Sequence, residues 1–169
     1  MFVLGIDPGL TRCGFGVVEG ALQGPESFRA VRAGVIETDR ADRVERRLGQ
    51  LLVELTTLLD EVVVDAVAVE RVFFQRNAKT AIPVAQASGV AVALAGARGL
   101  EVRQFTAQEA KLAVTGYGAA DKLQVQGMVA RLCGLHAIPQ PPDAADALAL
   151  AITYFTTCRT EHRLSGVAS

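Results

Sequence analysis

The chain has few cysteines, few charges and no long apolar run. Its three cysteines, Cys13, Cys133 and Cys158, are far apart and form no Cys-x-x-Cys pair, which argues against a disulfide framework or a zinc site. Only 21% of the residues are charged and 50% are hydrophobic, a balance that argues against disorder. No apolar run reaches the roughly 18 residues of a membrane span. The N-terminus shows no pattern of a secretory signal, so we expect a cytoplasmic protein without membrane contact.

Charge is distributed unevenly along the chain. The formal net charge is −1. Residues 71–122 contain seven Lys and Arg residues and three Asp and Glu residues, which gives this segment +4 and the remainder −5. A polyanion such as DNA could therefore bind one face of a nearly neutral protein.

The order of expected elements indicates an α/β fold. With 169 residues the chain has the length of one domain, which we place at 1–158, followed by a flexible tail at 159–169. Hydrophobic periodicity and turn residues predict strands at 2–7, 12–19, 28–37, 62–69 and 101–105. Helices are expected at 42–60, 78–97, after Thr106, after Asp121 and at 143–158. Short connections make the first three strands antiparallel, so we predict a mixed five-stranded sheet flanked by helices.

Four acidic residues stand in apolar surroundings. Asp7 ends the first strand, Glu70 ends the fourth, and Asp143 and Asp146 lie in "PPDAADALALA". Asp143 and Asp146 are three residues apart and share one helix face. Acids gathered at one sheet edge repel one another unless protons or a divalent cation relieve the repulsion. Carboxylates suit Mg²⁺ or Mn²⁺, and two ions about 4 Å apart would align an in-line phosphodiester hydrolysis.

Each acid also has a purely structural interpretation. Asp7-Pro8-Gly9 could be a turn, and Glu70 could mark the point where a strand reaches solvent. Asp143 could cap a helix and Asp146 could interact with its dipole. The metal-site hypothesis is preferred because three separate elements each deliver an acid to an expected sheet end.

Four segments together resemble a known family. "GIDPGLTRCGFGVVE", "VAVERVFFQRNAKTA", "AKLAVTGYGAADKLQV" and "DAADALALA" resemble, in order and spacing, the bacterial RuvC family of Holliday-junction resolvases, over about residues 1–158. The resemblance implies a ribonuclease H-like fold, a homodimer and Mg²⁺-dependent paired nicking of four-way junction DNA. It also implies cooperation with the RuvA–RuvB branch-migration complex.

The resemblance assigns roles to individual residues. The catalytic and metal-binding acids fall on Asp7, Glu70, Asp143 and Asp146, with two Mg²⁺ ions per site, for which Mn²⁺ can substitute. The family's aromatic, basic and lysine positions fall on Phe73, Arg76, Lys111 and Lys122.

The residue types agree with contacts to DNA. An exposed Phe73 or Phe74 could stack on an unpaired base, although both could instead belong to the core. Arg76 and Lys79 could reach phosphates or simply face solvent. Lys111 could support charge that grows on a phosphate, and Lys122 could meet a phosphate at a helix start. Arg71, His136 and His162 receive no role.

Other functions remain open at the level of sequence. The same fold could carry a ribonuclease H or an RNA-processing nuclease. Residues 7–11 also satisfy the DxGxT phosphate loop of actin-like and sugar-kinase-like ATPases, but those enzymes clasp nucleotide between two domains. A non-catalytic junction-binding protein is a third alternative. If the protein is a dimer, we expect its interface among the helices between 78 and 133.

Overall fold

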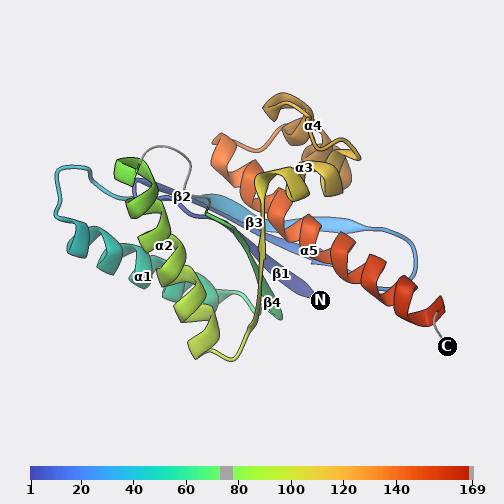
Figure 1. The fold of residues 1–169 in the computed structure, drawn as a ribbon, viewed down its shortest axis with the longest axis horizontal. Coiled ribbons are helices and arrows are strands. Elements are labelled where there is room, and N and C mark those ends of the chain that lie inside the picture. Colours follow the sequence, from blue (N-terminus) through green and yellow to red (C-terminus); the bar gives the residue numbers. More distant parts are fainter. Residues whose placement is uncertain (73–77, 168–169) are drawn as a thin grey trace.

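Five strands form one mixed sheet in the computed structural model, which describes residues 1–72 and 78–167 (Figure 1). The strands are β1 Phe2–Asp7, β2 Arg12–Gly20, β3 Phe28–Glu37, β4 Ala66–Glu70 and β5 Glu101–Phe105. They are arranged in the order β3-β2-β1-β4-β5. β1 and β3 both run antiparallel to β2, whereas β1, β4 and β5 run parallel to one another. The predicted mixed sheet with three antiparallel first strands is confirmed.

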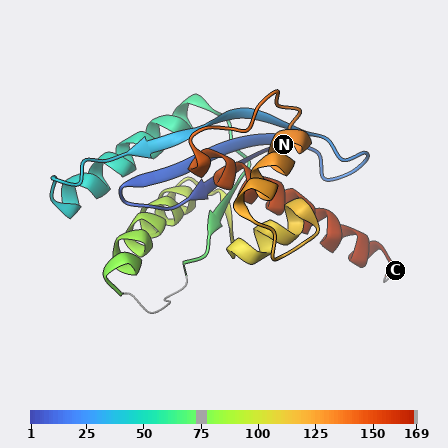
Figure 2. The same ribbon diagram turned by 90° about the horizontal axis from the view of Figure 1, so that it is seen from above.

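Helices cover both faces of this sheet (Figure 1 and Figure 2). They are α1 Val44–Glu61, α2 Ala78–Ala97, α3 Ala107–Thr115, α4 Lys122–Leu132 and α5 Pro142–Val167. Successive side chains of a strand point to opposite faces, and β1 follows this rule: Leu4 and Ile6 pack with α1 and α2, while Val3 packs with α3, α4 and α5. None of the described helices is long and apolar enough to cross a membrane.

Two helix starts match the predicted capping boxes. The Thr106 hydroxyl accepts the Glu109 N–H, and the Glu109 carboxylate accepts the Thr106 N–H. Asp121 and Gln124 make the same reciprocal pair at the start of α4. These caps satisfy amides that would otherwise lack partners, and they fix where α3 and α4 begin beside α5.

The predicted start of the fourth strand at residue 62 is wrong. Val62 instead ends α1, because its N–H donates to the Leu58 carbonyl. Asp65 then accepts the Phe2 N–H through its carboxylate at 2.6 Å. The strand begins only at Ala66, where pairing with Val3 of β1 starts.

The final helix is longer than predicted. It was expected to end at residue 158, but α5 continues to Val167. Long-range contacts hold this extension. Arg159 is buried and donates to the carbonyls of Ala21 and Gly24 in the β2–β3 connection, and Arg103 on β5 donates to both carboxylate oxygens of Glu161.

Glycines let α5 lie directly on the sheet. A Cβ on Gly5 of β1 would stand 1.9 Å from the Ala147 carbonyl oxygen, and a Cβ on Gly14 of β2 would stand 2.2 Å from the Asp143 carbonyl oxygen. Both contacts are with helix backbone, which cannot swing aside as a side chain can. The start of α5, with its two acids, is thereby brought down onto the strands beside Asp7.

Candidate active site

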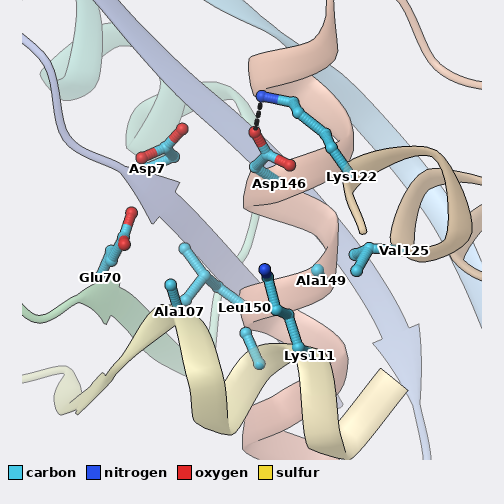
Figure 3. A pocket seen from close by; sticks show the side chains of 10 residues that line it. Asp7, Glu70, Ala107, Lys111, Lys122, Val125, Asp146, Ala149 and Leu150 are labelled. Atoms are coloured by element: carbon cyan, nitrogen blue, oxygen red, sulfur yellow. Dashed lines mark hydrogen bonds and ion pairs between the residues drawn. The ribbon is translucent and has the colours of Figure 1, made fainter. Parts of the chain in front are cut away.

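Three carboxylates from three elements meet at one end of the sheet. β1 and β4 run parallel and pair through Ile6 and Val69, so the residues that follow, Asp7 and Glu70, leave the sheet side by side. Asp146 reaches the same place from α5. The three acids line a cavity of about 230 Å³ (Figure 3). The other lining residues are Ala107, Ala110, Lys111, Lys122, Val125, Ala149 and Leu150.

Asp7 is the most perturbed carboxyl group of this cavity. Burial raises its pKa to about 8, with further contributions from a hydrogen bond with Glu70 and from the negative charges of Glu70, Asp146 and Asp143. Asp7 is therefore mostly protonated at neutral pH in the metal-free protein. Crowded, partly desolvated carboxylates of this kind are stabilised by a proton or by a cation.

The raised pKa predicts how stability depends on pH. Because folding raises the pKa of Asp7 from 3.8 to about 8, ionisation of Asp7 opposes folding increasingly as pH rises through this window. In a chelating buffer, Asp7→Asn is expected to be more stable than the parent at pH 9 by a few kcal/mol, since each pKa unit corresponds to about 1.4 kcal/mol. Thermal melts should show a gain of roughly 5–10 °C at pH 9 and almost none at pH 4. Asp42→Asn on the exposed loop before α1 is the matched control, and parallel pH profiles for Asp7→Asn and the parent would contradict the prediction.

Two lysines bring positive charge to the cavity. Lys122, at the first position of α4, donates to Asp146 Oδ2 at 2.7 Å, and this contact raises the pKa of Lys122. Lys111 lines the cavity from α3 (Figure 3), and no ion pair within the described residues engages it. Both lysines predicted from the sequence are thus brought to the acids.

Asp143 lies beside the cavity and does not line it. Arg12 Nε donates to Asp143 Oδ2 at 3.1 Å. Arg12 Nη2 forms an ion pair with the same oxygen at 3.0 Å. Arg12 therefore pairs with Asp143, and Lys122 pairs with Asp146. Within residues 1–72 and 78–167, no group of three His, Cys, Asp or Glu side chains has the arrangement that holds a metal ion.

The donor set nevertheless fits a hard divalent cation. Asp7, Glu70 and Asp146 offer only carboxylate oxygens, the ligands that Mg²⁺ prefers. Burial raises the pKa of Asp7 most, and the charges of the neighbouring acids raise it further; a cation would relieve this repulsion. Lys122 engages only Oδ2 of Asp146, and the backbone of the neighbouring Ala147 is held against Gly5, so Asp146 could offer an oxygen to a cation from a fixed position.

A hydrogen-bond network fixes the loop after Asp7. Arg47 on α1 donates to the hydroxyls of Thr11 and Thr38, at 2.8 and 2.9 Å, and Thr38 donates to the Leu10 carbonyl. Sequence reasoning assigned no role to Arg47, Thr38 or Arg12. Arg12 carried a weak signal as a charge at the start of a buried strand, whereas Arg47 looked like any other arginine of a polar helix turn.

The remaining predicted DNA-contact residues are not placed by the structure. Phe73, Phe74 and Arg76 lie outside the described residues, and so does the side chain of Lys79. Arg71, which received no role, donates to the Gln104 carbonyl at 2.9 Å.

Comparisons with known proteins agree with one another. The family model described as crossover junction endodeoxyribonuclease RuvC matches residues 3–154. The crossover junction endodeoxyribonuclease RuvC of Salinispora arenicola is 53% identical over 169 residues, which cover 99% of this chain and 95% of that relative. A Thermus thermophilus RuvC structure matches with a TM-score of 0.86 and 34% identity, covering 95% of this chain and 97% of the other. T. thermophilus RuvC in complex with a Holliday junction substrate matches with a TM-score of 0.85 and 32% identity, covering 95% and 96%.

Proposed function

The chain belongs to the RuvC family of crossover junction endodeoxyribonucleases, and from this membership we propose that the cavity at the end of β1 and β4 is where it hydrolyses junction DNA. The protein is a nuclease that acts on Holliday junctions in DNA recombination and repair. The observation that carries the assignment of the site is the convergence of Asp7, Glu70 and Asp146 with Lys111 and Lys122 in one cavity. Each nick leaves a 5′-phosphate and a 3′-hydroxyl.

Divalent-metal dependence follows from the family, and we assign Mg²⁺ as the metal, with Mn²⁺ as a substitute. Asp7, Glu70 and Asp146 are its proposed ligands, and Asp143 completes the set from the edge of the cavity. Bound metal supplies an activated water and charge stabilisation at the departing 3′ oxygen. Metal binding here would require Asp7 to be ionised, which its raised pKa opposes at neutral pH in the metal-free protein.

Basic side chains of the protein bind and orient the DNA phosphate that is to be cleaved. If Asp146 held a metal ion, the Lys122 ammonium that now pairs with it would be available to a phosphate in the cavity. Lys111, which lines the same cavity, supports charge that develops on the phosphate. Phe73 and Phe74 stack on bases that are unpaired at the junction, and Arg76 and Lys79 contact the DNA backbone.

A homodimer would match two active sites to the two-fold symmetry of a junction. Support for its interface comes from α2, whose described side chains are mostly apolar. Ala87, Ala91 and Ala95 bury one side of α2 against the sheet, while Ile82 keeps 52% of its surface exposed. A helix with apolar residues on its outer face is usually covered by another surface, and a second copy would cover this one. Cooperation with RuvA–RuvB is proposed from family membership alone.

Substrate preference tests the proposed function. Purified protein with Mg²⁺ is incubated with a four-way junction, a duplex of the same sequence and an RNA–DNA hybrid. We expect symmetric nicks in the junction and little cleavage of the other two. Preferred cleavage of the hybrid would instead identify a ribonuclease H, and tight ATP binding would revive the ATPase alternative.

Replacement of Lys122 separates chemistry from binding. Lys122→Gln should lower the single-turnover cleavage rate by about 10²-fold, because a cation beside the reacting phosphate is lost. Junction affinity without metal should change by less than about fivefold, since one phosphate contact among many is affected. Arg131→Gln, on the last turn of the same helix, is the matched control. Equal cleavage by Lys122→Gln and Arg131→Gln would contradict this role.

A further inference from the structure

Arg12 connects two acids from different parts of the fold. It stands at the start of β2 and lies opposite Glu37, the last residue of β3, in the sheet register. Its Nη1 is 3.0 Å from Glu37 Oε1. Its Nε and Nη2 both contact Oδ2 of Asp143, at 3.1 and 3.0 Å. One guanidinium therefore links β3, β2 and the start of α5.

Asp143 is held in two independent ways. Its backbone rests on Gly14, where even a methyl group would stand 2.2 Å from the carbonyl oxygen. Its side chain is directed by Arg12, which uses Oδ2 alone. Hydrogen bonds among the described residues leave Oδ1 without a partner. The negative charge of Asp143 also contributes to the raised pKa of Asp7, which places Asp143 within electrostatic reach of the cavity.

We propose that Arg12 is a positioning residue for the metal centre: it fixes Asp143 with one carboxylate oxygen bound and the other left for the cation, and Glu37 fixes Arg12 in turn. The inference rests on the proposed function, because it requires Asp143 to act as a ligand. Residues that hydrogen-bond to metal ligands orient them, and their loss lowers metal affinity by 10–100-fold.

The chemistry of arginine favours positioning over a simple ion pair. Arg12 is 40% exposed and Asp143 27% exposed at the side chain, and exposed pairs contribute only about 0–1 kcal/mol to stability. The planar guanidinium serves two carboxylates in one fixed geometry, which a lysine ammonium does not. A positive charge near the site would by itself weaken cation binding, so the two roles of Arg12 predict opposite effects on metal affinity.

Mg²⁺ titrations of Arg12 variants test the proposal. Binding is measured by calorimetry on DNA-free protein, and the Mg²⁺ concentration for half-maximal junction cleavage is measured separately. Arg12→Gln should raise both constants by about 10–100-fold, while the cleavage rate at saturating Mg²⁺ stays within about threefold of the parent. For Arg12→Lys, both constants should lie between those of the parent and those of Arg12→Gln. Glu37→Gln should raise both constants by less than Arg12→Gln does. Arg29→Gln, which breaks the ion pair with Glu19 on the same sheet, should change neither constant.

The outcomes separate this inference from the proposed function. Unchanged or tighter Mg²⁺ binding by Arg12→Gln overturns the positioning role. Asp7→Asn is measured beside it: loss of Mg²⁺ binding and of cleavage in Asp7→Asn, with a neutral Arg12→Gln, rejects the inference alone. Retained binding and cleavage in Asp7→Asn reject the proposed site itself.

Discussion

Asp7→Asn is expected to reduce junction cleavage by about 10³-fold or more while junction binding is retained or strengthened. An amide keeps the shape of the side chain but cannot supply the carboxylate that we propose as a metal ligand, and losses of this size are usual when a central catalytic group is removed. Binding is retained at neutral pH because Asp7 is mostly uncharged there in the metal-free protein, and it is strengthened above pH 8, where Asp7 would carry a negative charge near the DNA phosphate. Single-turnover cleavage in Mg²⁺ and a binding titration without metal measure the two effects.

Controls separate this result from a folding defect. Asp42→Asn makes the same chemical change on an exposed loop and should leave both measurements unchanged. Because Asp7→Asn is expected to stabilise the metal-free protein above neutral pH, its melting temperature provides an internal check. Lost binding together with a lowered melting temperature would indicate misfolding, and unchanged cleavage would mean that the catalytic site lies elsewhere.

Local patterns in the sequence predicted much of the fold. Short Gly- and Pro-containing connections made the first three strands antiparallel, and both capping boxes formed at Thr106 and Asp121. Such features depend on residues close together in the chain. The acids at strand ends were equally visible, because a charge after a run of buried residues needs a compensating partner.

Contacts between distant segments were not predictable in the same way. Arg12 and Asp143 are separated by 131 positions, and nothing in "GLTRCG" indicates which carboxylate its arginine will meet. The extension of α5 beyond residue 158 depends on Arg159 reaching the β2–β3 connection. The predicted strand start at residue 62 was wrong because a short apolar run can belong to a helix end as well as to a strand.

The approach of α5 to the sheet predicts a large effect from a single methyl group. Gly5→Ala would place its Cβ 1.9 Å from the Ala147 carbonyl oxygen and 2.9 Å from the Ala151 amide nitrogen. Both atoms belong to the helix backbone, so only a displacement of α5 from β1 can relieve the overlap. Overpacking of this kind costs about 3 kcal/mol, which corresponds to a fall of roughly 10 °C in the melting temperature of a protein of this size.

The same displacement reaches the active site, because Asp146 directly precedes Ala147. We therefore expect Gly5→Ala to lose cleavage activity even at temperatures where the variant remains folded, and to bind Mg²⁺ more weakly than the parent. Gly49→Ala on α1 is the matched control, since no atom lies within 4 Å of its added Cβ, and alanine should stabilise that helix by about 0.5–1 kcal/mol. If Gly5→Ala melts and cleaves like the parent, close contact between α5 and β1 is not what brings Asp146 to Asp7.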